Sequence, residues 1–435
     1  MTHVTLHALG AIQVEEAEVV AGPGHSFLGA EEAALVQRVL ASWQLSRYRF
    51  GEPDSTEPSM VFSLEREVEK RMETRHCLAV NSGTSALLTA FAALGLGPGD
   101  EVLVPGYTFI ATIAAVVHRG AIPVLVEIDD SLTLDPEDVV RQITRSTKVI
   151  VAVHMLGAPC AMDELRAIAD DHGLVLVEDV AQACGGRYHT RSLGTIGDAG
   201  AFSLNLFKII TAGDGGWVTC NDDKVYERAF AFHDHGFKPF RQGVVDAESL
   251  FGLNLRMHEL TGAVALGQLR KLDDILTTLR CQKAAFADAI GDLPCVARRR
   301  LNDAEGECCS LLVLTFKSAE VAAAVAARLR TPTLVDSGRH YYGNMSQLFG
   351  HRMPTGTECP FACAAHPTTR RYEPRMLPRT DDLLARSIAL SVGVVDTYLG
   401  SSFGIGPHSS PDDITAAAEA LHLAVGEAVA EAGRS

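Results

Sequence analysis

The chain has 435 residues, 47% hydrophobic and 21% charged, and these proportions are typical of a globular protein large enough for two or three domains. Its formal charge is −16, and this excess of acidic residues argues against nucleic acid or an anionic membrane as the main partner, because both attract basic surfaces. No stretch approaches the roughly 18 consecutive apolar residues of a membrane helix, and the ten cysteines form no CxxC pair. We therefore expect small-molecule chemistry in a reducing cytoplasm, with mostly buried thiols.

Helical and extended patterns alternate along the first part of the chain. Residues 1–30 lack periodicity and are predicted to form an arm, and apolar spacing then predicts helices at 30–42 and 62–72. The strands predicted after them lie at 76–80, 101–105, 121–128, 149–154 and 174–178, and they alternate with helices predicted at 85–94, 110–119, 136–143 and 162–172. This alternation predicts an α/β domain with a mostly parallel sheet covered on both faces. Ligands of such sheets bind beyond the carboxyl ends of the strands.

The regular alternation of predicted strands and helices ends near residue 273. A long helix to residue 289, a strand at 311–316 and helices at 319–329 and 412–431 predict a smaller α+β domain. The irregular stretch 335–378 is long for a connection, so it is either functional or loosely ordered. We therefore divide the chain into an arm (1–30), a large domain (31–272) and a small C-terminal domain (273–435).

One lysine stands alone in the stretch 199–220. Lys208 follows a β-prone run in an otherwise uncharged segment, and glycines at 213, 215 and 216 precede a second β-prone run. Burial disfavours the charged form of lysine, so the amine becomes a nucleophile that forms a Schiff base with a carbonyl. The alternative is a surface lysine in a hairpin turn, which is the commoner situation for a single lysine.

Two earlier strand ends carry residues suited to a phosphorylated, flat ligand. Gly83, Thr84 and Ser85 open a helix just after a strand, and free amides and hydroxyls at a helix start form an anion site. The alternative is that Thr84 or Ser85 only caps the helix. Tyr107 and Phe109 follow the next strand, where an aromatic ring can lie against a heterocycle, although packing in the core is the commoner role.

A third strand end adds a carboxylate. Asp179 ends a run of apolar residues, where a buried carboxylate requires a cationic or protonated partner, and Gln182 adds an amide three residues later. A lone lysine, a buried carboxylate, an anion site and an aromatic ring are together what pyridoxal 5′-phosphate (PLP) requires. In this interpretation Lys208 binds the aldehyde and Asp179 keeps the ring nitrogen protonated.

Six motifs in this order resemble those of the DegT/DnrJ/EryC1/StrS family of PLP-dependent sugar aminotransferases. They are NSGTSAL, PGYTFIAT, VHMLGAPCAMDE, EDVAQACGG, FSLNLFKIITAGDGG and FGLNLRMHELTGAVALGQLRKLDD, between about Leu28 and Ile275. The last motif and the later segment LPRTDDLLARSIALSV further resemble the transaminases that make 8-amino-3,8-dideoxy-octulosonate. The family resemblance implies fold type I, with a large domain around a mostly parallel seven-stranded sheet and a smaller C-terminal α+β domain.

The resemblance also implies roles at the cofactor ring. Lys208 matches the Schiff-base lysine, Asp179 the partner of the pyridine nitrogen, Gln182 the residue that hydrogen-bonds the ring hydroxyl, and Phe109 the stacking aromatic. Relatives that dehydrate sugars carry histidine in place of this lysine, so Lys208 indicates a transaminase.

Further matches concern the phosphate. Gly83 and Thr84, beside Ser85, match the phosphate-binding turn, and Ser203 matches a further phosphate hydroxyl. Asn254 matches an asparagine that reaches the phosphate from the neighbouring subunit. The resemblance therefore implies a homodimer with shared active sites.

The implied reaction moves an amino group from glutamate or glutamine, through pyridoxamine phosphate, to a keto sugar or similar polyhydroxylated carbonyl compound in secondary-metabolite or surface-sugar biosynthesis. Two alternatives remain: another PLP reaction such as dehydration or epimerisation, or a non-catalytic PLP-binding regulator. We expect substrate choice to depend on the stretch 335–378 and on Arg47 and Arg49. We expect no metal site, because His233 and His235 have no third ligand at a suitable spacing.

Overall fold

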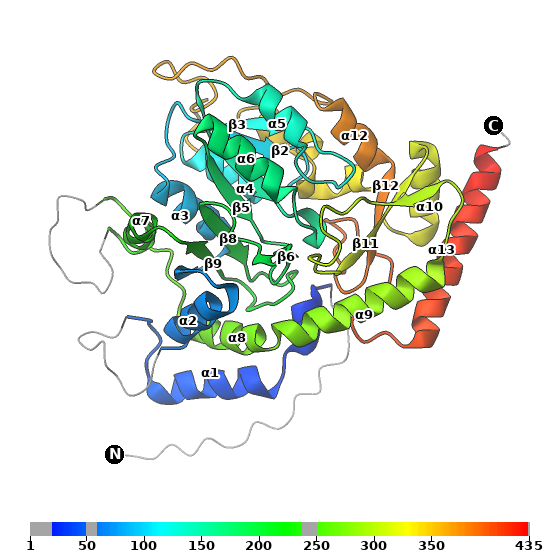
Figure 1. Ribbon diagram of the computed structural model, residues 1–435, viewed down its shortest axis with the longest axis horizontal. Helices are drawn as coiled ribbons and strands as arrows, with labels where there is room; N and C mark the ends of the chain where they lie inside the picture. The colour runs from blue at the N-terminus through cyan, green and yellow to red at the C-terminus, as the bar shows by residue number, and fades with distance from the viewer. Residues whose placement is uncertain (1–19, 49–58, 237–249, 434–435) are drawn as a thin grey trace.

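The computed structural model describes residues 20–48, 59–236 and 250–433. A seven-stranded sheet lies at its centre, with helices on both faces (Figure 1). Across the sheet the strands are β1 (His76–Val80), β9 (Gly216–Cys220), β8 (Ala199–Ser203), β5 (Val175–Asp179), β4 (Thr147–Val153), β2 (Glu101–Pro105) and β3 (Ile122–Val126). β9 is antiparallel to both of its neighbours, and the other pairs in the sheet are parallel. The predicted mostly parallel sheet is confirmed.

The strands are apolar along almost their whole length because both faces of the sheet are covered. In β4, Val149 and Val151 belong to one buried cluster, whereas Ile150 and Ala152 belong to the cluster on the opposite face. The first face is covered by α3 (Gly83–Ala93) and α4 (Ile110–His118). The opposite face is covered by α2 (Met60–Met72), α6 (Met162–His172) and α8 (Glu259–Arg270), with α1 (Ala30–Ser42) packed on α8.

The helices and strands predicted between residues 30 and 178 are all present, and each ends within two residues of its predicted bounds. α5 (Pro136–Gln142) completes this set, and α7 (Asp223–His233) packs on α3 and β1. No helix of the described residues is long and apolar enough to cross a bilayer.

The second sheet lies within the predicted small domain. Its antiparallel strands are β10 (Val296–Arg298), β11 (Leu311–Phe316) and β12 (Ser387–Ser391), and it packs with α10 (Ala319–Leu329), α12 (Pro378–Ala385) and α13 (Pro411–Ala432). The stretch 335–378 is not loosely ordered throughout: it contains the short helices η5 (Gly338–His340), η6 (Tyr342–Asn344) and α11 (Ser346–Phe349), and its side chains Tyr342 and Tyr372 are buried.

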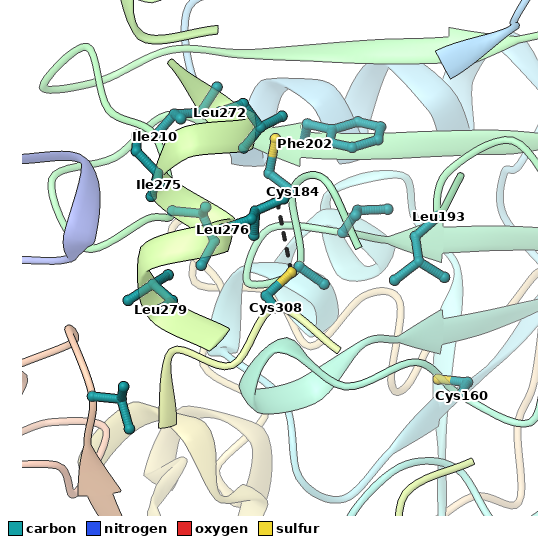
Figure 2. Close-up of a cluster of buried hydrophobic side chains, with 14 of the residues drawn as sticks. Cys160, Cys184, Leu193, Phe202, Ile210, Leu272, Ile275, Leu276, Leu279 and Cys308 are labelled. Carbon is teal, nitrogen blue, oxygen red and sulfur yellow. Dashed lines mark hydrogen bonds between the residues drawn. The ribbon is translucent and has the colours of Figure 1, made fainter. Parts of the chain in front are cut away.

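The long helix α9 (Leu272–Ile290) joins the two parts of the molecule. Its residues Ile275 and Leu279 share one buried cluster with Phe202 of the large sheet and Leu421 of α13, so a continuous core links the two sheets. Figure 2 shows the α9 part of this cluster, where the thiol of Cys308 donates to the carbonyl oxygen of Cys184 across 3.7 Å. All ten cysteines are free thiols, but only five of them are buried, fewer than predicted.

The end of the predicted arm packs against the segment that carries Lys208. The backbone N–H of Gly22 donates to the Leu206 carbonyl at 3.0 Å, and that of Gly24 to the Lys208 carbonyl at 3.3 Å. A Cβ atom on Gly22 would lie 2.2 Å from the carbonyl carbon of Phe207, so this close approach requires glycine. The first 19 residues of the arm lie outside the described residues.

Candidate active site

Lys208 lies on the connection between β8 and β9, at the edge of the sheet where the central parallel strands end. Its side chain is partly buried, and its Nζ makes no hydrogen bond or ion pair within the described residues. Burial lowers the pKa of Lys208, while the negative charges of Asp179 and Asp396 oppose this shift. The lysine is therefore not the surface residue of the alternative interpretation, and it has the properties of a nucleophilic amine.

Asp179 is the last residue of β5 and is 5% exposed. Its Oδ2 accepts a hydrogen bond from Oγ1 of Thr112 at 2.8 Å, and its Oδ1 accepts from the backbone N–H of Ala181 at 3.1 Å. Burial raises the pKa of Asp179, and these two hydrogen bonds, together with the charge of Lys208, oppose the shift. The carboxylate is thus fixed in direction and suited to a cationic partner.

Sequence reasoning missed Thr112, the residue that orients this carboxylate. Thr112 is buried in α4, and its hydroxyl also lies 2.8 Å from that of Thr108, one helical turn earlier. The available signal was a threonine in the first turn of an otherwise apolar helix that follows a strand end, with Thr108 just before that helix.

The start of α3 is capped by a residue other than those predicted. Ser82 is the N-cap, and its Oγ accepts from the backbone N–H of Ser85 at 3.1 Å. The Ser85 hydroxyl is buried and donates to Oδ1 of Asn81 at 2.6 Å. Ser82, and neither Thr84 nor Ser85, therefore caps this helix, and Ser85 contributes its backbone N–H and a hydrogen bond to Asn81. Thr84 is exposed, and the amides of Gly83 and Thr84 lie in the first turn, where no intrahelical acceptor exists.

The end of β8 meets this helix start. A Cβ atom on Gly83 would lie 2.6 Å from Cβ of Ser203, so the two residues are in direct contact. The Ser203 oxygen accepts from the backbone N–H of Asn205 at 3.3 Å, which leaves its hydroxyl proton free to donate. Gly83, Thr84 and Ser203 together form a cradle of donors at the positive end of a helix, as an anion site requires.

Gln182 and Phe109 are the two residues that the resemblance assigns to the hydroxyl and the face of the cofactor ring. Oε1 of Gln182 accepts from the backbone N–H of Leu156 at 2.9 Å, which leaves the amide NH₂ as a donor. Phe109 precedes α4, is 37% exposed, and its ring centroid lies 5.1 Å from that of His340. Tyr107, in contrast, is fully buried in the core, so only Phe109 of the two aromatics remains available for stacking.

A small cavity brings Lys208 and Gln182 together with His340 and Asp396. His340 comes from the stretch 335–378 and Asp396 from the turn after β12, far from the other site residues in sequence. The prediction that this stretch contributes to the site therefore has support in His340. No sequence motif pointed to Asp396.

Arg47 was predicted to face the substrate, and this prediction is wrong. Its side chain is 8% exposed and forms an ion pair with Glu65, which is itself completely buried. Burial raises the pKa of Glu65 to about 7, although the Arg47 charge opposes the shift. The pair is structural, and it holds the end of the α1–α2 connection against α2. Arg49 lies outside the described residues.

Asn254 and His233 lie together at the end of α7. Asn254 is exposed, and its Oδ1 accepts from the backbone N–H of Arg256 at 3.5 Å. His233 is buried, with Nε2 3.0 Å from the Tyr48 hydroxyl and Nδ1 2.5 Å from the Phe230 carbonyl. Among residues 20–48, 59–236 and 250–433, no three His, Cys, Asp or Glu side chains gather as a metal site.

The donor set of the site fits PLP. Lys208 supplies an unpaired amine, Asp179 an anchored carboxylate for the ring nitrogen, and Gln182 an amide donor for the ring oxygen. The cradle of Gly83, Thr84 and Ser203 supplies donors without any carboxylate, as a phosphate requires.

The DegT/DnrJ/EryC1/StrS aminotransferase family model matches residues 49–392. The chain belongs to this family. GDP-perosamine synthase of Vibrio cholerae is 34% identical over 63% of this chain and 71% of its own length. An L-glutamine:2-deoxy-scyllo-inosose aminotransferase of Streptoalloteichus tenebrarius is 40% identical over 46% of this chain and 49% of its own length. The erythromycin biosynthesis sensory transduction protein EryC1 of Saccharopolyspora erythraea is 46% identical over 49% of this chain and 57% of its own length.

Solved structures agree with this assignment over nearly the whole chain. 3-Amino-5-hydroxybenzoic acid synthase has a TM-score of 0.74 and 27% identity, covering 92% of this chain and 97% of its own. DesV of S. venezuelae has a TM-score of 0.70 and 30% identity, and the match covers 94% of this chain and 99% of the DesV chain. The fold of this family member is thus fold type I of the PLP-dependent aminotransferases, as the resemblance implied. The narrower likeness to octulosonate transaminases is not confirmed by these relatives and stays a prediction.

Proposed function

We propose that this family member uses PLP to move an amino group from glutamate or glutamine to a keto sugar or a similar polyhydroxylated carbonyl compound. The observation that carries the proposal is Lys208, which is unpaired, partly buried and placed beside the anchored carboxylate of Asp179. Relatives named as a perosamine synthase and as glutamine:inosose aminotransferases support a hydroxylated acceptor and an amino-acid donor.

PLP, when bound, supplies an electron sink for the electrons left when the donor's α-carbon loses a proton. Lys208 Nζ is the base that takes this proton and the acid that returns one, a double role that the lowered pKa of a buried amine favours. Asp179 holds a proton on the ring nitrogen, and Thr112 keeps the carboxylate oriented toward it. Gln182 donates to the ring oxygen, while Gly83, Thr84 and Ser203 bind the phosphate.

A homodimer with shared sites is part of the proposal. Phe251 is fully exposed, Leu253 is 50% exposed, and Asn254 follows them on the same exposed segment. Five residues beyond Asn254, the backbone N–H of Glu259 donates to the Leu45 carbonyl at 3.1 Å, and Trp43 and Leu45 are themselves 91% and 52% exposed. An apolar surface of this kind is typical of a subunit interface. In the dimer, Asn254 reaches the phosphate of the other subunit.

The test is the absorbance spectrum of the purified protein with PLP, before and after L-glutamate and L-glutamine are added separately. We expect a visible band from the lysine-bound cofactor that one donor converts to the amine form. Lys208→Ala removes both the band and turnover, whereas Lys317→Ala, at an exposed lysine, keeps both. No band in the wild type contradicts the proposal. A band that neither donor changes favours a different PLP reaction or a regulatory role.

A further inference from the structure

Two groups from the C-terminal part of the chain line the cavity at Lys208 and are not used by the mechanism above. They are His340, in η5, and Asp396, in the turn after β12, and they are 5% and 6% exposed. Both share the cavity with Lys208 and Gln182. The hydrogen bonds that each side chain already makes determine what it offers to a ligand.

The hydrogen bonds of His340 fix its tautomer. Its Nδ1 lies 3.0 Å from the Tyr398 carbonyl oxygen and 3.3 Å from that of Ser337, and carbonyl oxygens only accept, so Nδ1 carries the proton. Burial, together with the positive charge of Lys208, lowers the pKa of His340 to about 4, so the ring is neutral near pH 7. Nε2 therefore carries a lone pair and can only accept a hydrogen bond.

Asp396 is held rigidly, with one oxygen left over. Its Oδ1 accepts from the backbone N–H of Tyr398 at 2.8 Å, and its carbonyl accepts from those of Gly400 and Ser401 at 3.0 Å each. The backbone N–H of Leu399 also acts on this carboxylate and lowers its pKa, as that of Tyr398 does, but within the described residues no side chain donates to Oδ2. Burial raises the pKa of Asp396, and the charge of Lys208 opposes the shift.

Three titratable groups lie near Lys208, and they come from three different elements. Asp179 lies at the end of β5, His340 in η5 and Asp396 in the turn after β12. Both oxygens of Asp179 already accept hydrogen bonds, from Thr112 and from Ala181. Asp396 is therefore the carboxylate that keeps a free oxygen for the lysine or for a substrate.

We propose that Asp396 is a positioning residue for the Lys208 nitrogen. Together with His340 it forms a surface that offers only hydrogen-bond acceptors, here called the acceptor-only wall, and this wall selects the substrate. The negative charge of Asp396 holds a proton on that nitrogen. Oδ2 of Asp396 and Nε2 of His340 take hydrogen bonds only from groups that bring a proton, as the hydroxyl groups of a substrate do. The inference rests on the proposed function and names the two side chains that recognise the hydroxyl groups of its acceptor.

The first test is a pH titration of the visible band of the PLP-loaded protein, which reports protonation of the cofactor-bound lysine nitrogen. We expect Asp396→Asn to lower the midpoint by about one pH unit, because a charge that favours the protonated form is removed. The asparagine oxygen can still accept from Tyr398, and Asp396→Glu restores the charge and returns the midpoint toward the wild-type value. Asp171→Asn, at an exposed position, leaves it unchanged.

The outcomes separate the two proposals. An unchanged midpoint in Asp396→Asn, in a protein that retains the band, overturns the role of Asp396 and leaves the proposed function standing. Absence of the band from the wild type overturns both.

The second test addresses selection by comparing two ring amines that differ in hydroxylation. The probes are scyllo-inosamine and cyclohexylamine, titrated into the PLP-loaded protein while the shift of the visible band is followed. We expect the wild type to favour the hydroxylated amine at least about tenfold, as one or two hydrogen bonds to charged or buried acceptors provide. Asp396→Asn loses most of this preference. Equal responses of the wild type to the two amines, including none to either, overturn the acceptor-only wall.

Discussion

At the scale of single residues, the site depends on side chains that orient the groups acting on the cofactor. Thr112 is the clearest case, because its hydroxyl fixes one oxygen of Asp179 from a neighbouring helix. A hydrogen bond to a charged group contributes about 1.5–3 kcal/mol, which corresponds to roughly 10- to 100-fold in a rate that depends on that charge.

We expect Thr112→Val to slow turnover by about that factor, because the carboxylate loses a donor and its pKa rises further. Thr112→Ser keeps the hydroxyl and serves as the matched control, with turnover near the wild-type value. Single-turnover kinetics with the donor measures the effect on the proton transfer itself. A valine variant as fast as the serine variant would show that Asp179 does not need Thr112.

His233 makes the stability of the protein depend on pH. Burial, with the charge of Arg47, lowers the pKa of His233 from 6.5 to about 3. Below pH 6.5 the unfolded chain therefore binds a proton at His233 that the folded chain does not bind. Its contribution to stability is present above pH 6.5 and is lost as the pH falls toward 3, by up to about 1.4 kcal/mol per pH unit.

We expect His233→Gln to flatten this decline, measured as the urea-unfolding free energy at pH 7.5, 6 and 5. His172→Gln, at an exposed histidine, provides the control with the wild-type slope. The idea fails if the variant at position 233 loses stability as steeply as the wild type.

At the scale of elements, the connection that carries Lys208 is held from outside the large sheet. Gly22 lies so close to Phe207 that a side chain there displaces the backbone beside the lysine. The neighbouring hydrogen bonds to Leu206 and Lys208 tie both segments together. The described end of the arm, whose role the sequence did not reveal, therefore supports the connection that carries Lys208, the proposed catalytic residue.

We expect Gly22→Ala to weaken PLP retention at least about tenfold and to lower the unfolding free energy by about 1–3 kcal/mol, because a sub-van-der-Waals contact forces the backbone apart. Gly97→Ala is the matched control, since a Cβ atom there meets no atom within 4 Å. Dialysis against buffer without PLP, followed by absorbance, measures retention. Equal retention in the two variants would show that the contact is not needed.

The elements that could be predicted from sequence are those whose signal is local. β4 and β5 are buried on both faces, so each shows a continuous apolar run, and the helices between them show apolar spacing of 3 and 4 residues. Lys208, Asp179 and Gln182 could be predicted because Asp179 ends a strand, the other two follow strand ends, and all three lie inside motifs. His340 and Asp396 could not, since only tertiary packing brings η5 and the turn after β12 to the lysine. Arg47 was misinterpreted because its partner, Glu65, lies 18 residues away on α2, so no local sequence signal indicated the ion pair.

At the scale of the whole molecule, the apolar segment around Phe251 decides whether one chain can complete a site. A fully exposed aromatic side chain at the centre of an interface commonly contributes more than 2 kcal/mol to association. In the proposed dimer, dimerisation and catalysis would be coupled through Asn254 on the same segment.

We expect Phe251→Ser to weaken the dimer at least about 30-fold and to make activity per chain fall on dilution. Leu423→Ser, which removes a 65% exposed leucine on α13, leaves association unchanged. Sedimentation velocity over a concentration series measures both variants. A wild-type protein that sediments as a monomer at all concentrations would contradict the shared site.

The contacts of the arm also set an order of assembly during synthesis. Ala21 and Gly22 leave the ribosome early, yet Gly22 bonds to Leu206, and the carbonyl of Ala21 accepts from the backbone N–H of Val395 at 2.9 Å. Chains are made from the N-terminus and fold as their segments emerge. Gly22 and Gly24 can bond to the Lys208 connection once residue 208 has been translated, whereas the contact of Ala21 forms only after the last strand of the small sheet. A ribosome-bound nascent chain that ends before residue 395 therefore lacks the hydrogen bond that ties the arm to the small sheet.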